Sequence, residues 1–278
     1  MSALKLEDVL ARADILPALP QVVRHILDTL RDERANAELL AERIGSDPAV
    51  VARLLAAANA SAYGLAGHVD SLRQAVLLLG IEKVRAITLA TAIVDRYHSA
   101  PPFDAQRLWL HSLGVAVCAR EIAIHAGLDA ESAFTAGLLH DIGQLLLFAV
   151  EPAAYAETLG AKGRLDISTV DAEHSCLGLD HAAVGAALAR HWSLPEAIVL
   201  AIGGHHAPEA LPDHELADVV HVAEVLSHAL DLGGAPDNLV PELSELACAR
   251  LGIEWDEFAA RFPEIDARFD CICLMLGL

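Results

Sequence analysis

Five histidines and two carboxylates in the C-terminal half of the chain have the side-chain chemistry of a metal site. They are His111, His140, Asp141, His181, His205, His206 and Glu224. Burying so many ionisable groups without mutual pairing or a metal would be costly. A divalent cation binds neutral imidazoles and neutralises carboxylates at the same time. For any single histidine of the set, a hydrogen-bonded position in the core is the alternative.

Two of these residues are adjacent. His140 and Asp141 stand side by side in the apolar run "AGLLHDIGQLLLFAV", residues 136–150. Neighbouring residues of a helix point roughly 100° apart, so the pair can grip one ion from two sides. The aspartate can also bridge two ions while the histidine binds one, and two metals about 3.5–4 Å apart suit phosphoester hydrolysis. We therefore expect a divalent metal ion (Fe, Mn, Mg or Zn) at this pair, and the sequence assigns no catalytic residue.

Helices must position these side chains, because helical periodicity dominates the chain and strand alternation is absent. A helix is expected from about 104 to 126, ending at Gly127. The next is expected to follow the capping residue Asp129 and to run unbroken to Pro152. Later helices are expected at about 167–176, 180–192, 195–203, 214–231, 239–251 and 255–260.

The N-terminal half is also expected to be helical. Its helices are predicted at 20–32, from the cap Ser46 onward, from 70 or 71 to Gly80, and at 82–97. The segment "SAPPFD", residues 99–104, has two prolines and no periodicity, and is the clearest linker. The expected fold is all-α, with an N-terminal helical bundle over 1–100 packed on a second helical domain over 101–278.

Composition limits the classes of partner. The 278 residues are 54% hydrophobic but only 4% aromatic, so an Ala- and Leu-rich helical core is expected. A formal charge of -20 repels phosphate backbones and anionic membranes, so we expect no nucleic-acid or membrane partner. The five cysteines form no CxxC, and neither a signal peptide nor an apolar run of about 18 residues is evident. These features favour reduced thiols in a cytoplasmic protein.

One segment has the pattern of a helix-turn-helix. Residues 37–55, "AELLAERIGSDPAVVARLL", would place Gly45 in the turn. A recognition helix carries basic and amide side chains toward the DNA groove, and this one offers only Arg53 before Asn59. With the chain at -20, we interpret the segment as a helical hairpin of the bundle.

The order of the sequence motifs resembles a known family. "HSLGVAVCAREIA", "AGLLHDIG", "HAAVGAAL", "HH" and "VAEVLSHAL" are similar to the HD superfamily of helical metal-dependent phosphohydrolases. "LPALPQVVRHIL", "IGSDPAVVARLLAAANASAYG" and "SLRQAVLLLGIEKVRAI" resemble the start of the HDOD (HD-related output domain) family. The resemblance covers about residues 14–232. It implies an N-terminal helical bundle packed on a modified HD domain.

The resemblance also implies a ligand set. His111 matches the first ligand histidine of HD proteins, and His140 with Asp141 matches the HD pair itself. Glu224 stands where the last ligand aspartate of the relatives stands, in "VAEV". This exchange lengthens the carboxylate arm by one methylene.

Further positions resemble the HD-GYP branch, which hydrolyses cyclic-di-GMP. His181 and the pair His205–His206 fall where that branch keeps additional metal-binding histidines. The chain departs from it elsewhere. The GYP loop is missing, Ala207 replaces the acidic residue after the histidine pair, and Gln144 replaces the lysine that follows "HDIG". The metal ligands are thus largely retained, while the apparatus for the substrate is incomplete.

Two functions follow from the resemblance. The first is a regulatory output domain of bacterial signal transduction that acts mainly on a protein partner and has a degenerate or metal-capable HD site. The second is an active metal-dependent phosphohydrolase on a nucleotide or cyclic dinucleotide. The missing loop and lysine favour the first function, and the retained ligands favour the second.

Overall fold

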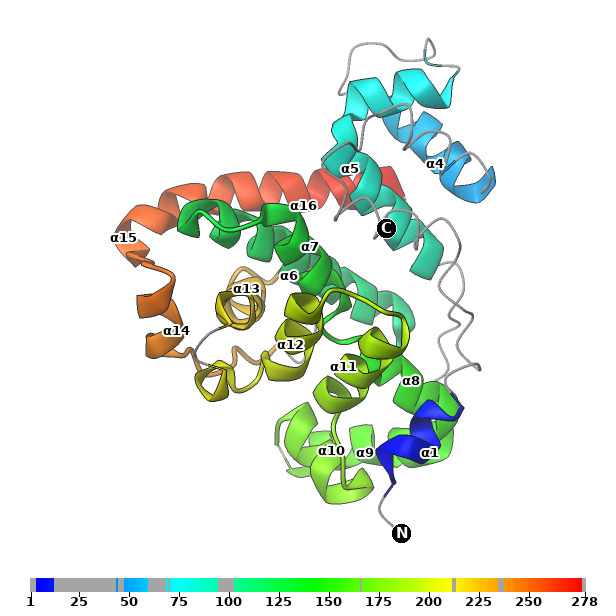
Figure 1. Cartoon of the computed structure of the whole chain (residues 1–278), viewed down its shortest axis with the longest axis vertical. Coiled ribbons are helices and arrows are strands. Elements are labelled where there is room, and N and C mark those ends of the chain that lie inside the picture. Colours follow the sequence, from blue (N-terminus) through cyan, green and yellow to red (C-terminus); the bar gives the residue numbers. More distant parts are fainter. Residues whose placement is uncertain are drawn as a thin grey trace. The chain divides into compact units, whose positions relative to one another are not determined.

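The computed structural model is helical throughout the part of the chain that it describes (Figure 1). It describes residues 4–12, 44, 48–59, 69, 71–94, 103–165, 167–211, 214–234 and 238–276. No strand occurs among these residues, so the prediction of an all-helical chain is confirmed for them. The helix expected at 20–32, the cap Ser46 and most of the hairpin at 37–55 lie outside them.

The chain divides into two compact units. The first contains Met1–Pro17 and Ser99–Asp266, and the second contains Ala18–His98 and Ala267–Leu278. One boundary lies close to the expected linker at 99–104. Each unit consists of two pieces that are distant in the sequence, whereas the sequence suggested a single cut near residue 100.

In the second unit, α4 (Pro48–Ala58) packs against α5 (Leu72–Val94). Gly80 interrupts α5 with φ 80 and ψ 158, which is the break that the sequence placed there. A positive φ of this size favours glycine because it has no Cβ. The side chain of Asn59 links the end of α4 to Val69: it donates to the carbonyl of Val69 at 2.7 Å and accepts from its N–H at 3.0 Å.

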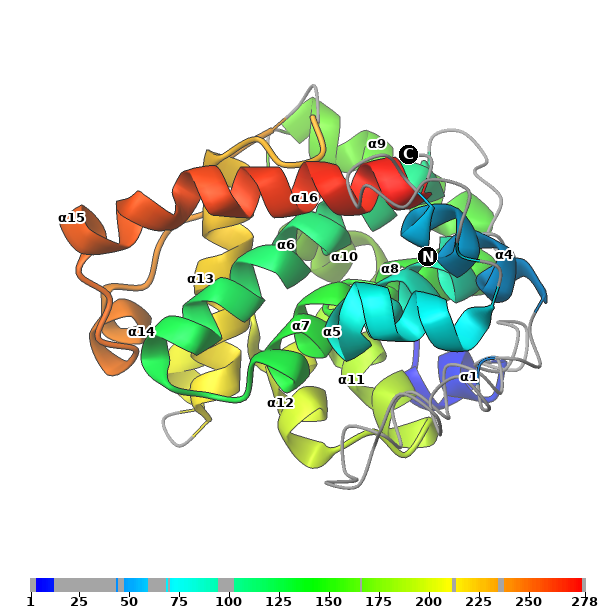
Figure 2. The ribbon, with the colours of Figure 1, turned by 90° about the horizontal axis from the view of Figure 1, so that it is seen from above.

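The first unit is built around α6 (Ala105–Ala126), α7 (Ala130–Leu139) and α13 (Glu215–Ala229), which pack on one another (Figure 2). Gly127 ends α6, as the sequence predicted, and does so in the left-handed conformation. The side chain of Asp104 caps its start. Small residues allow the helices to approach closely. A Cβ atom on Gly137 would lie 2.9 Å from the Cα of Ala116.

A second layer of the same unit contains α8 (Ile142–Val150), α11 (His181–His191) and α12 (Glu196–Gly204). The helix α11 packs against both α8 and α12. At the α8–α11 contact, a Cβ on Gly143 would lie 2.0 Å from the carbonyl oxygen of His181. Only a glycine lets the two backbones come this close, and this contact brings His181 next to the His140–Asp141 pair.

The remaining helices complete the outside of this unit. They are α1 (Leu6–Leu10), α9 (Pro152–Leu165), α10 (Thr169–Leu177), α14 (Glu245–Arg250), α15 (Trp255–Phe258), the 3-10 helices Pro208–Ala210 and Ala259–Arg261, and α16 (Phe262–Leu276), which continues into the second unit. Neither α9 nor α16 was among the expected helices. The helix expected at 239–251 is shorter, since it starts only at Glu245.

One stretch of the described residues is long and apolar enough to cross a membrane by length and composition. It is Ala130–Val150, with a mean hydropathy of 1.5, and 83% of its most apolar window is buried. The expectation that no apolar run reaches this length was therefore wrong. Its burial identifies the stretch as part of the core, and such core helices commonly pass a hydropathy test.

Candidate metal centre

The adjacent pair lies in a turn between two helices. The expected single helix from Asp129 to Pro152 is wrong at this point, because α7 ends at Leu139 and α8 starts at Ile142. Asp141 has φ -98 and ψ 9, which is outside the helical region. The turn changes the direction in which its side chain leaves the backbone. As a result, both His140 and Asp141 are directed into the interior, where His140 is fully buried and Asp141 is 6% exposed.

Three buried histidines are held by hydrogen bonds from the same ring nitrogen. Nδ1 of His140 lies 2.7 Å from the carbonyl oxygen of Gly137, and Nδ1 of His205 lies 2.7 Å from that of Ile202. Nδ1 of His181 lies 2.7 Å from a carboxylate oxygen. Because these oxygens can only accept, Nδ1 carries the proton in each ring. In His140 and His205, whose pKa burial lowers, the free lone pair is therefore on Nε2, which is the arrangement of metal-binding histidines. In His181, Nε2 lies 3.0 Å from Oδ1 of Asp141 and carries a second proton, because Glu173 and Asp141 raise the pKa of this ring.

The Nε2 atoms converge on Asp141. Its Oδ1 lies 3.0 Å from Nε2 of His181 and 3.9 Å from Nε2 of His205. Its Oδ2 lies 3.5 Å from Nε2 of His140 and 3.9 Å from Nε2 of His111. Ligand atoms bound at about 2.0–2.1 Å to one ion lie roughly 3–4 Å from each other. Each carboxylate oxygen thus faces a different pair of histidines, at separations that an ion between them would require.

Two buried nitrogens support this fit independently. Among the described residues, Nε2 of His140 and Nε2 of His205 are buried without any hydrogen-bond partner. An unpaired buried polar atom costs about 1–3 kcal/mol, so a fold that keeps two of them side by side needs a reason. Coordination of a cation satisfies both atoms, since each already presents its lone pair.

The remaining predicted ligands border the same cluster. Nε2 of His206 lies 2.9 Å from Nε2 of His181, and Nδ1 of His206 lies 3.9 Å from Oε2 of Glu224. Ligand atoms of His140, His205 and Glu224 lie within 4.8 Å of one another, and so do those of His181, His205 and His206. All seven residues named from the sequence are therefore brought together by the first unit.

The electrostatics of the cluster suit a cation. Burial is the main cause that lowers the pKa of His111 and of His206 to about 3, and it also lowers the pKa of His140 and His205. These imidazoles are neutral at pH 7 and can donate a lone pair. Burial would raise the pKa of Asp141, but the facing histidines hold it well below its usual range.

Two groups carry a proton that a metal ion would displace. Burial first, and Asp141 second, raise the pKa of Glu224 to about 8. Burial alone would lower the pKa of His181, but Glu173 and Asp141 raise it well above the usual value. Asp141 and Glu224 therefore need a cation nearby in order to be negatively charged at the same time.

Comparison with known proteins shows the family of the chain. The family model named HDOD domain matches residues 16–208. The chain belongs to the HDOD domain family. An HDOD domain protein of unknown function from Geobacter sulfurreducens is 28% identical, with a TM-score of 0.78 and coverage of 96% of both chains. A protein from Shewanella amazonensis, named only provisionally as a phosphohydrolase, is 27% identical with a TM-score of 0.75, and the match covers 96% of this chain and 97% of that one.

The curated relatives match a smaller part of the chain than these structures do. Ribonuclease Y of Desulfotalea psychrophila is 30% identical over 164 residues, which are 59% of this chain and 25% of that protein. The chain spans less than half the length of the first curated relatives that it matches.

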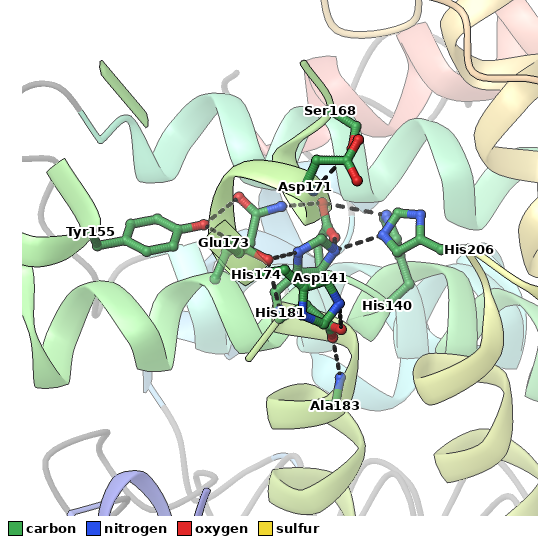
Figure 3. Close-up of polar contacts among 12 residues, drawn as sticks. His140, Asp141, Tyr155, Ser168, Asp171, Glu173, His174, His181, Ala183 and His206 are labelled. Carbon is green, nitrogen blue, oxygen red and sulfur yellow. Dashed lines mark hydrogen bonds and ion pairs between the residues drawn. The ribbon is translucent and has the colours of Figure 1, made fainter. Parts of the chain in front are cut away.

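Behind the candidate metal centre, a chain of hydrogen-bonded side chains supports Asp141 and His181. The sequence did not predict these supporting residues. Tyr155 donates to Oε1 of Glu173 at 2.9 Å, and Glu173 accepts from Nδ1 of His181 with its other oxygen (Figure 3). The same Oε2 accepts the backbone N–H of His181 at 2.8 Å. Gln144 donates to Oδ2 of Asp141 at 2.8 Å, and its amide oxygen lies 3.2 Å from the Tyr155 hydroxyl, whose one proton it shares with Glu173. Such partners orient ligands and raise their basicity.

A cavity of about 660 Å³ lies over this HDOD centre, and Asp141, Glu224 and several of the histidines form part of its wall. The described residues that line it include one arginine, Arg107, and one lysine, Lys162. Lys162 is on α9, a helix that was not predicted, so the sequence reading missed it. The volume is in the range of small-molecule sites.

His228 was not among the ligands predicted from the sequence. It lies in the last turn of α13. It is half-buried, it lines the cavity, and its ring centroid lies 4.8 Å from that of His111. Ligand atoms of His228, His111 and Glu224 lie within 4.8 Å of one another. Its position one turn after Glu224 on α13 was the available signal, because residues four apart share a helix face.

Proposed function

We propose that this HDOD chain is a regulatory output module of bacterial signalling whose HD-type centre binds two divalent metal ions. The observation that carries the metal binding is that each oxygen of Asp141 faces its own pair of histidine Nε2 atoms. On one side His111, His140 and Glu224 would hold an ion. On the other side His181, His205 and His206 would hold the second. Asp141 would bridge them.

The metal binding is tested with Asp141→Asn, which keeps the shape of the side chain and removes its charge. Asp256→Asn, at an exposed aspartate of α15, is the matched control. Saturation at about 100 times Kd stabilises a protein by about 2.7 kcal/mol. For a chain of this size that is a rise in melting temperature of roughly 5–10 °C. Wild type and control should show this rise with Mn²⁺ and a stoichiometric metal content, and Asp141→Asn should lose both.

The regulatory part of the proposal rests on what the centre offers a substrate. Gln144, in place of the lysine that the HD resemblance expects, uses its amide N–H on Asp141 and its amide oxygen on Tyr155. Its amide therefore contacts Asp141 and Tyr155, and it offers no positive charge to a bound phosphate. The net charge of -20 fits a basic surface on a protein partner better than an anionic polymer.

A second function is supported by the cavity. Bound divalent ions supply Lewis acidity and an activated water for attack at phosphorus. Arg107 and Lys162 line the cavity beside the centre and would contact the phosphate of a nucleotide or cyclic dinucleotide. The relatives named Ribonuclease Y give a phosphodiester as the class of substrate to test.

The two functions are separated by turnover of bis-p-nitrophenyl phosphate and cyclic-di-GMP with Mn²⁺-loaded protein. A regulatory module shows no turnover above that of Asp141→Asn. A hydrolase shows turnover that Asp141→Asn abolishes and that Lys162→Met lowers at least tenfold, whereas Lys5→Met on α1 leaves it unchanged. That second pattern would replace the regulatory proposal.

A further inference from the structure

The ring of His228 is oriented by Asn238, which follows it across the loop after α13. The amide nitrogen of Asn238 donates to the carbonyl oxygen of His228 at 2.8 Å and to Oδ1 of Asp231 at 2.9 Å. These two acceptors fix which end of the amide is the nitrogen. The amide oxygen consequently faces Nδ1 of His228 and accepts its proton. Asn238 thus occupies Nδ1 of His228, and Nε2 is the ring nitrogen that it leaves available to a ligand.

The ring of His228 is on the His111 and Glu224 side of the centre, and its centroid lies 4.8 Å from that of His111. Glu224 and His228 are four residues apart on α13 and lie on the same helix face. Their ligand atoms lie within 4.8 Å of each other and of a nitrogen of His111. An imidazole and a glutamate side chain are a typical ligand pair for a divalent ion.

Asn238 also begins the segment 238–244, which has no helix or strand. Residues 238–242 line the cavity, and Leu239 and Val240 are 64% and 54% exposed. At its far end the N–H of Ser244 donates to Nε2 of His221 at 3.0 Å. Two histidines of α13 therefore hold the two ends of this segment.

The second anchor also reaches the centre. Nδ1 of His221 donates to the backbone carbonyl of His205, at 2.8 Å, and His205 is one of the predicted ligands. Both ends of segment 238–244 are thus connected through one histidine side chain to the metal cluster. The segment is irregular, and its apolar side chains Leu239 and Val240 are exposed, so its order depends on such anchors.

We propose that His228 is a further metal-binding residue, on the His111 and Glu224 side, and that Asn238 couples metal occupancy to the order of segment 238–244. This inference rests on the metal binding proposed above. A metal ion on Nε2 of His228 fixes the ring, and the ring fixes Asn238 and the cavity wall that begins there. The signal leaving the HDOD module would then be the state of this wall.

The test measures Mn²⁺ affinity by calorimetry and amide hydrogen exchange of residues 238–244 with and without Mn²⁺. In the wild type, Mn²⁺ should slow exchange in this segment at least tenfold. His228→Ala should weaken Mn²⁺ binding roughly tenfold or more and abolish the metal-dependent slowing. His191→Ala, at an exposed histidine that ends α11, is the control and should behave as wild type.

Asn238→Asp separates a ligand role of His228 from a purely structural one. The new carboxylate still accepts from Nδ1 of His228 and makes the ring more basic, so Mn²⁺ affinity should stay the same or rise. It can no longer donate to Asp231 or to the backbone, so the slowing of exchange in the segment should be lost.

The possible failures are distinguishable. Absence of Mn²⁺ binding in the wild type removes both this inference and the metal centre. Wild-type binding with an unchanged affinity in His228→Ala removes only the inference. Unchanged metal-dependent exchange in both His228→Ala and Asn238→Asp would show that the segment does not respond to the centre.

Discussion

Metal binding at pH 7 should release about two protons from this protein. The two groups that must lose a proton are Glu224, with a pKa of about 8, and His181, with a pKa well above its usual value. At pH 7 Glu224 is roughly nine-tenths protonated, since one unit below a pKa gives about ten to one. His181 is largely protonated as well. The other four histidines of the centre are already neutral and release nothing.

Linkage converts this release into a pH dependence of affinity. If two protons leave, the logarithm of the association constant rises by about 2 per pH unit near pH 7. From pH 6.5 to 7.5 the affinity should therefore rise roughly a hundredfold, or about 2.7 kcal/mol. Above pH 8 the slope should fall toward one, because Glu224 is then ionised before the metal arrives.

Calorimetry in buffers of different ionisation enthalpy measures the released protons directly. In Glu224→Gln the release at pH 7 should fall from about two protons to about one, even if the affinity itself is lower. Glu215→Gln, at an exposed glutamate of the same helix, should release as many as the wild type. The reasoning is refuted if the wild type binds metal without releasing protons, or if Glu224→Gln releases as many protons as the wild type.

Three further predictions follow from the packing and the charges. Without metal, stability to urea should fall by roughly 1 kcal/mol or more between pH 6.5 and 8, because Glu224 and His181 have raised pKa values in the folded state and lose protons there; Mn²⁺ should remove this fall. Gly143→Ala should cost about 1–3 kcal/mol or more in urea unfolding because its Cβ would meet the backbone of α11, whereas Gly163→Ala on α9, where the space is open, should be neutral or slightly stabilising. Tyr155→Phe should lower the free energy of unfolding by about 1–3 kcal/mol, since it removes a buried donor to the carboxylate that holds His181; an unchanged urea midpoint would show that this hydrogen bond contributes nothing.

The helices of the first unit could be predicted where local signals define their ends. Gly127 and Asp129 have the predicted roles at helix ends because capping depends on a few neighbouring residues. The break at His140–Asp141 could not be predicted in the same way. The apolar pattern continues through it, and the turn is stabilised by contacts from distant helices.

The identities of the seven predicted ligands came from residue type and from the family resemblance, but their convergence required the fold. The supporting residues were not recognised because their sequence context is that of a solvated surface. Glu173 is in the polar run "DAEHS", yet it is fully buried behind His181. Its burial is decided by the packing of α10 on α9, and α9 contains two glycines that obscure its helical pattern.

Gln144 shows how one residue can preserve metal binding while weakening catalysis. Its neutral amide donates to Oδ2 of Asp141 without neutralising it, so the full carboxylate charge remains available to the ions. A lysine ammonium at the same distance would compete with a metal ion for that oxygen, or would have to turn toward the cavity and a bound phosphate. The glutamine brings no positive charge to a phosphate, and its donor, the amide nitrogen, is directed to Asp141. A centre that keeps its ligands but has a neutral amide at this position is better suited to sensing a metal ion than to turning over a phosphoester, and it is this missing charge that favours the regulatory function.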